Sequence, residues 1–171
     1  MVTFRRILVA WDGSDAAEAA LLMAASYADA VGATVEALTV FDGRSRAGID
    51  GAFEVTGPEY ERVTTRFQAR FGDGRIPFHA VASSSNPGQV IAQYADDRDF
   101  DLIAVGRPAA DESGDHDHAV PILKRQSSAT VLVVSAEGTA PTLEGLSGAA
   151  VFRQETWGGL APPRGERRGR G

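Results

Sequence analysis

The chain has 171 residues, of which 43% are hydrophobic and 23% are charged, with a formal net charge of −6 and no cysteine. This length and balance predict one globular domain and exclude a wholly disordered chain. The lack of cysteine excludes disulfides, iron–sulfur clusters and cysteine nucleophiles, and the negative charge argues against a nucleic-acid partner for the folded part.

Five short apolar runs bounded by turn residues predict five strands. The runs lie at Arg5–Trp11, Thr34–Phe41, Ile76–Ala82, Phe100–Gly106 and Thr130–Val134. Within the first run, the residues from Ile7 to Trp11 are continuously apolar, which is typical of a strand buried on both faces.

Four segments with helical spacing of apolar residues separate these strands. They are Ala16–Val31, Glu59–Phe71, a helix that opens at Asn86-Pro87-Gly88, and Val120–Gln126. Ser14 and Asn86 are predicted as N-caps and Gly32 as a C-terminal stop. The third helix is expected to turn Val90, Ile91, Tyr94 and Ala95 inwards.

The alternation of strands and helices predicts an α/β fold, a three-layer sandwich with a five-stranded parallel sheet and four helices. Ligands of such sheets bind outside the carboxyl ends of the strands. The expected site is therefore formed by Trp11–Asp15, by the loop after Phe41 and by the loop Gly106–Asp117.

Composition changes near residue 137, which we interpret as the end of the domain. Residues 138–171 are rich in Gly, Pro and Arg and show no apolar period, so we predict a 1–137 domain followed by a tail without regular structure.

Nothing in the sequence predicts a membrane span or a secretion signal. The longest apolar stretch, Ala19–Ala28, falls far short of the roughly 20 residues that a bilayer requires. The N-terminal apolar run is stopped by Asp12, too early for a signal peptide. We therefore expect a cytoplasmic protein that binds neither membranes nor nucleic acid.

Several segments in order resemble the universal stress protein family. They are Arg6–Ser14 (RILVAWDGS), Leu38–Asp42 (LTVFD), Asp101–Gly106 (DLIAVG) and Val131–Val134 (VLVV). The resemblance implies a parallel sheet of order 3-2-1-4-5, similar to the adenine nucleotide alpha hydrolase fold. It also implies a homodimer through the last strand, Thr130–Val134. Some members of that family bind ATP and others do not.

The ATP-binding members carry a Gly-x2-Gly-x9-Gly-Ser/Thr loop after the fourth strand, whose backbone N–H groups hold the phosphates. Here Gly106 follows Val105 at the first position, but Ala109 replaces the second glycine. The final pair falls on Asp117-His118, after seven intervening residues rather than nine, or on Ala119-Val120 when counted forward. Acidic side chains that would repel a triphosphate stand at Asp111, Glu112, Asp115 and Asp117. This comparison predicts that the phosphate half of the site is lost.

The adenosine half is better retained. By the resemblance, Ala10, Trp11 and Asp12 form the turn that meets adenosine, and Val40 lies near the base. Trp11 could stack on the base or fill its pocket. Asp12 could contact the ligand or serve only the turn and the helix start.

The motif Asp115-His116-Asp117-His118 raises the hypothesis of a metal site. The alternative is a solvated acidic loop in which Asp117 caps the following helix, and we favour it because adjacent loop residues rarely converge on one ion. The remaining histidine, His79, lies on the third predicted strand. No Gly-x-Ser-x-Gly nucleophile motif is present, so no metal and no catalytic residue are expected.

These patterns favour a non-catalytic, dimeric stress-response or regulatory module without a bound cofactor. The alternative is an AMP- or ATP-binding protein with a divergent loop. An enzyme that hydrolyses or transfers nucleotides is a third hypothesis, against which the missing glycines count. The sequence identifies no protein partner and no pathway.

Overall fold

The computed structural model describes residues 3–42, 57–72, 74–107, 119–135 and 142–144. The strands are β1 (Arg6–Ala10), β2 (Thr34–Asp42), β3 (Phe78–Ser83), β4 (Leu102–Arg107), β5 (Thr130–Ser135) and β6 (Thr142–Glu144). The helices are α1 (Asp15–Val31), α2 (Pro58–Phe71), α3 (Pro87–Asp97) and α4 (Ala119–Gln126). All nine elements expected from the sequence are present, with ends within about two residues of the predicted ones.

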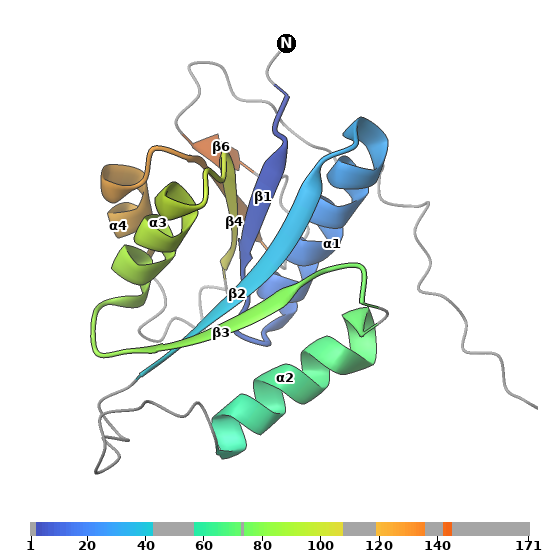
Figure 1. Cartoon of the computed structure of the whole chain (residues 1–171), viewed down its shortest axis with the longest axis vertical. Coiled ribbons are helices and arrows are strands. Elements are labelled where there is room, and N and C mark those ends of the chain that lie inside the picture. Colours follow the sequence, from blue (N-terminus) through green and yellow to red (C-terminus); the bar gives the residue numbers. More distant parts are fainter. Residues whose placement is uncertain (1–2, 43–56, 73, 108–118, 136–141, 145–171) are drawn as a thin grey trace, which may run out of the picture.

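The strands form one sheet of order β3-β2-β1-β4-β5-β6, whose first five strands are parallel. The predicted order 3-2-1-4-5 is therefore confirmed. Helices α1 and α2 cover one face of the sheet, and α3 and α4 cover the other (Figure 1).

The continuous apolar run of β1 is explained by these two layers. Ile7 and Val9 pack into the core on the α1 and α2 face, whereas Leu8 packs into the core on the opposite face. All three side chains are fully buried. Because successive strand residues point to opposite faces, a strand covered on both sides buries all of its side chains, which favours a continuous apolar run.

The predicted helix ends are confirmed. The Ser14 side chain accepts a hydrogen bond from the Ala17 N–H (3.1 Å), and Gly32 closes α1 in the left-handed conformation, with φ of 73°. Asn86 caps α3 by accepting from the Gly88 N–H (2.8 Å). These local signals set where α1 and α3 start and where α1 turns back to β2.

The inner face of α3 differs in part from the prediction. Ile91 and Ala95 are buried as expected, but Val90 and Tyr94 are only half-buried and Ala92 takes an inner position. The Tyr94 ring instead lies against Phe100 at the margin of this core, with ring centroids 6.2 Å apart. Small residues on the inner face let α3 pack closely against the sheet.

The predicted order 3-2-1-4-5 places the fifth strand at the edge of the sheet, and in this respect it is wrong for β5. Strand β6 pairs with it in antiparallel orientation, placing Thr142, Leu143 and Glu144 opposite Val133, Leu132 and Val131. This strand belongs to the segment predicted as a tail without regular structure, so the tail adds three residues to the sheet. Residues 145–171 lie outside the described part of the chain.

An ion-pair network joins α1 to α2. Arg66 donates hydrogen bonds to Asp15 and to Glu18 (2.9 Å for Glu18), and Arg70 donates to Glu18 through its Nε (2.7 Å). The hydrogen bond to Asp15, followed by that to Glu18, raises the pKa of Arg66. The Glu18 side chain is only 14% exposed, which makes it the best-shielded member of the network.

We expect Glu18→Gln to lower the free energy of unfolding by about 0.5–1 kcal/mol at low salt, because it keeps the side-chain shape but removes the charge that faces two arginines. Urea denaturation of both proteins measures the difference. In about 1 M NaCl the difference is expected to shrink, since salt screens partly exposed pairs. An equal loss at both salt concentrations would contradict an electrostatic role.

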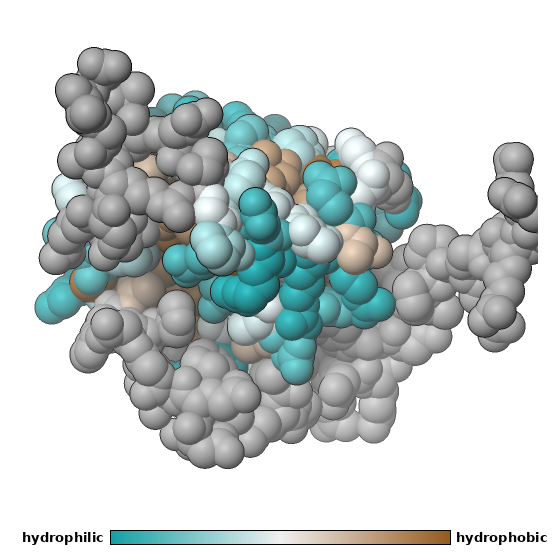
Figure 2. All heavy atoms as spheres, turned by 90° about the horizontal axis from the view of Figure 1, so that it is seen from below, coloured by the Kyte–Doolittle hydropathy of each residue, from teal (hydrophilic) through white to brown (hydrophobic). Residues whose placement is uncertain are grey.

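Seen from the side on which α2 lies, the described surface is mostly hydrophilic (Figure 2). Among the described residues outside β6, Val31 is the one large apolar side chain that is exposed. No helix in the described segments is long and apolar enough to cross a bilayer.

Candidate functional site

The carboxyl ends of β1 and β4 form the switch point of the sheet. From β1 the chain passes to α1 on one face, and α4, which follows β4, lies on the other face (Figure 1). The two strands are direct neighbours, with Ala10 opposite Val105. In parallel sheets a crevice outside the strand ends at such a point is the usual binding position.

Three of the predicted site residues come together on one face of the sheet. Ala10 is paired with Val105 on one side and with Leu38 on the other, and Val40 lies two residues beyond Leu38. Ala10, Val40 and Val105 all pack on the α3 and α4 side, where Val105 is buried and the other two are half-buried. They form an apolar floor next to the strand ends.

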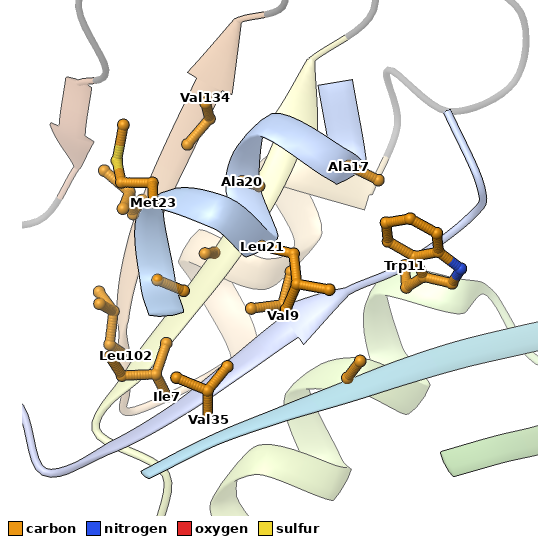
Figure 3. Close-up of a cluster of buried hydrophobic side chains, with 14 of the residues drawn as sticks. Ile7, Val9, Trp11, Ala17, Ala20, Leu21, Met23, Val35, Leu102 and Val134 are labelled. Carbon is orange, nitrogen blue, oxygen red and sulfur yellow. The ribbon is translucent and has the colours of Figure 1, made fainter. Parts of the chain in front are cut away.

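Trp11 lies on the other face and belongs to the core. Its ring packs edge-on against Phe67 and Phe71, with centroids 5.6 and 5.8 Å apart, and its Nε1–H donates to the Val63 carbonyl (3.3 Å). Figure 3 shows the indole beside Ala17 of α1, at the end of β1. The residue is only 2% exposed, so a base could not stack on the ring unless α2 moved away.

Asp12 shapes the turn between β1 and α1. Its Oδ1 accepts a hydrogen bond from the Ser14 N–H (2.8 Å), and the following Gly13 has φ of 77°. The Arg62 guanidinium donates to the Asp12 carbonyl (3.4 Å). This is the turn chemistry expected of an Asp at a helix start, and it brings an exposed arginine of α2 to the turn, which the sequence pattern did not indicate.

Thr39 also holds the chain at the end of β1, a role that was not predicted from the sequence. Its hydroxyl donates to the Trp11 carbonyl (2.6 Å), and the Trp11 N–H donates to the Leu38 carbonyl (2.8 Å). Among the described residues Thr39 is the one buried polar side chain. The signal in the sequence is a hydroxyl residue inside the apolar run Leu38–Phe41, because buried hydroxyl groups need a hydrogen-bond partner.

Gly106 is required by packing. A Cβ atom built on it would lie 2.3 Å from the carbonyl carbon of Ala16, 2.4 Å from the nitrogen of Ala17 and 2.6 Å from the Ala16 oxygen. These are backbone atoms of the first turn of α1, which cannot swing aside as a flexible side chain can. The close approach of α1 to β4 therefore explains this glycine without reference to a ligand.

The remaining predicted site residues, Ala109, Asp117 and His118, lie outside the described residues, as does the proposed metal motif Asp115–His118. Within the described segments no group of three or more His, Cys, Asp or Glu side chains is placed to hold a metal ion. His79 contacts Glu36 (Nε2 to Oε2, 3.0 Å) on the neighbouring strand β2.

A groove of about 600 Å³ lies along α3 and the end of β3, apart from the Asp12 turn. Its lining includes Ser83, Gln89, Gln93 and Asp96. Asp96 is occupied in holding the turn after α4, since its Oδ1 accepts from the Ser127 hydroxyl (2.9 Å) and from the Ser128 N–H (3.0 Å).

The model of the universal stress protein family matches residues 3–134 of the chain. A comparison with curated protein sequences gives no match.

Solved structures of universal stress proteins share the fold. One, in complex with cAMP, is 22% identical with a TM-score of 0.52, and the match covers 79% of this chain and 99% of that one. A protein of the family from Burkholderia pseudomallei is 24% identical with a TM-score of 0.56, covering 78% and 98%. A third, from Archaeoglobus fulgidus in complex with dAMP, is 20% identical with a TM-score of 0.55, covering 78% and 99%.

Proposed function

Because the chain belongs to the universal stress protein family, we propose that it acts as a non-catalytic regulatory module of the stress response that does not bind ATP tightly. A cytoplasmic location fits the absence of cysteine, since a reducing compartment does not favour disulfides.

The observation that carries this proposal is the packing of Gly106. It is the one glycine of the phosphate-loop pattern that the sequence retains, and its missing side chain is explained by the backbone of α1. The other pattern positions hold Ala109, Asp117 and His118, whose side chains do not leave the backbone as accessible as glycine does. The retained glycine is therefore no argument for a phosphate site.

Asp12 supports the same proposal, because one of its carboxylate oxygens is already used within the turn. A residue selected for the turn needs an acceptor at Oδ1 and no charge. The hydrogen-bond acceptor and the charge of Asp12 can be separated by substitution, since asparagine keeps the acceptor and removes the charge.

A second candidate function is the binding of an adenosine group or AMP. The apolar floor of Ala10, Val40 and Val105 favours it, because the large indole of Trp11 lies on the opposite face and does not fill that side. An adenine ring needs a flat apolar surface with a few polar groups at its margin. The solved structures with cAMP and dAMP are similar to this chain in fold.

The test is a titration of ATP with Mg²⁺, and of AMP and cAMP, by calorimetry and thermal shift. We expect no ATP in the purified protein and no stabilisation by ATP. Binding would be easy to detect, because a ligand at 100 times its Kd adds about 2.7 kcal/mol to the free energy of unfolding. Asp12→Asn is expected to leave stability within about 0.5 kcal/mol of the original, whereas Asp12→Ala removes the acceptor for Ser14 and costs about 1 kcal/mol. Neither is expected to change the response to nucleotides.

Stoichiometric ATP in the purified protein would overturn the proposal. Micromolar binding of AMP that Asp12→Asn abolishes without a loss of stability would establish the second candidate instead. In that case equal affinities for AMP and ATP are expected, because the phosphate half contributes nothing.

We also propose that the module forms a homodimer through Thr130–Val134 of β5. This strand is apolar and β-branched, and its outer edge accepts an antiparallel partner. Any second chain that pairs with this edge at Val131–Val133 must take the place of β6.

A further inference from the structure

The two edges of β5 are covered very differently. Towards β4, pairing runs along the whole strand, from Thr130 opposite Leu102 to Ser135 opposite Arg107. On the outer side β6 pairs only with Val131, Leu132 and Val133. The described residues of the chain thus pair with the outer edge at three of the six residues of β5.

Strand β5 does not depend on β6 for its position. Val131 packs into the core on the α3 and α4 side, and Leu132 and Val134 pack into the core on the α1 side. All three are at most 3% exposed. A three-residue strand at a sheet edge, in contrast, is held by few backbone hydrogen bonds, and such elements open before the core does.

We propose that β6 is an exchangeable cover of the β5 edge, and that β5 of a second copy of this chain takes its place. The two partners exclude each other because both need the outward N–H and C=O groups of Val131–Val133. The edge already accepts an antiparallel strand, and two identical strands related by a two-fold axis pair in that orientation. This inference rests on the proposed dimer and adds a control over it from within the chain.

Competition within the chain weakens the dimer in a predictable way. If β6 is docked in about ten of eleven molecules, each chain is competent for pairing about one tenth of the time. Both chains must be open, so the apparent Kd of the dimer rises about a hundredfold. Removing β6 from the edge should therefore lower the apparent Kd of the dimer about a hundredfold.

Two variants test the competition in the full chain. The variant Thr142→Pro/Leu143→Pro/Glu144→Pro has no backbone N–H at these three positions, so β6 loses the donors with which it pairs to β5. The variant Val133→Cys/Thr142→Cys places two cysteines at opposed positions in a chain that has none of its own, and oxidation then ties β6 to β5. The single variant Thr142→Cys is the control for oxidation itself.

The readout is molar mass by light scattering between about 1 and about 100 μM. We expect the proline variant to dimerise about a hundredfold more tightly than the unchanged chain. The oxidised double-cysteine variant should stay monomeric throughout, and reductant should return it to the behaviour of the unchanged chain. The oxidised and reduced forms are the same molecule, so this comparison stands even if the proline variant does not fold.

Equal dimerisation of the unchanged, proline and locked proteins would leave the dimer in place and overturn the role of β6. A proline variant that folds and stays monomeric at the highest concentration would overturn the β5 dimer itself, and the inference with it. On oxidation of the double-cysteine variant, a covalent dimer linked from position 133 of one chain to position 142 of the other would show exchange of β6 between chains, which contradicts pairing of β5 with β5. A covalent dimer linked between the two copies of position 133 would instead support that pairing.

Discussion

Trp11→Ala is expected to lower the free energy of unfolding by about 3–5 kcal/mol, the usual cost of deleting a large aromatic side chain from a core. The indole is 2% exposed and holds α2 against the sheet through its edge-on contacts with Phe67 and Phe71. Its removal also leaves the Val63 carbonyl without the Nε1–H donor. Against a typical total of about 5–15 kcal/mol, this loss is large.

Urea denaturation followed by far-UV circular dichroism measures the effect, and Trp11→Phe is the matched control. A phenyl ring keeps an aromatic contact with α2 but loses volume and the hydrogen bond to Val63, so a loss of about 1–2 kcal/mol is expected. A loss below about 1 kcal/mol for Trp11→Ala, combined with an altered response to AMP, would contradict the core assignment and indicate contact with a ligand.

The order of strands and helices could be predicted because each element carries a local signal. The apolar run of β1, the Ser14 cap and the Gly32 stop depend only on neighbours within a few residues. The ends of strands are set instead by pairing across the sheet. Phe100, for example, is apolar and buried but lies just before β4, because pairing with β1 begins at Leu102.

The face on which a side chain lies at a strand end was harder to predict. Trp11 follows the last residue of β1, and the sequence left open whether its ring would meet a ligand or fill space. The deciding partners, Val63, Phe67 and Phe71, are more than 50 positions further along the chain. Their stripe on α2 is visible in the sequence, but its contact with Trp11 is a property of the packed layers.

Strand β6 could not be predicted from its own residues. Thr142, Leu143 and Glu144 show no apolar alternation and stand in a segment rich in Gly and Pro. What makes them a strand is the free edge of β5, which exists only once the sheet has formed. Short edge strands of this kind depend on the tertiary structure more than on propensity.

Gly106→Ala is expected to destabilise the protein by about 3 kcal/mol, at the upper end for adding one methyl group to a packed interior. The new Cβ would meet backbone atoms of Ala16 and Ala17 at 2.3–2.6 Å, so either α1 or β4 must shift. Both lie in the centre of the fold, where β4 is paired on both sides and α1 packs against it. Urea denaturation at neutral pH measures the loss.

Two other substitutions, one at a glycine of α3 and one at the residue after Gly106, serve as comparisons for this expected loss of stability. Gly88→Ala would bring a Cβ to 2.9 Å from the Ala119 carbonyl oxygen, at the start of the short helix α4, and a smaller loss of about 1 kcal/mol is expected because this helix end can adjust. Arg107→Ala removes an exposed side chain next to Gly106 and should change stability by less than about 0.5 kcal/mol.

If Gly106→Ala were as stable as Arg107→Ala but altered nucleotide binding, the glycine would serve a ligand. If it is strongly destabilised, loss of binding in any variant at Gly106 reports unfolding, and Asp12→Asn is the substitution that can separate a ligand site from a structural turn.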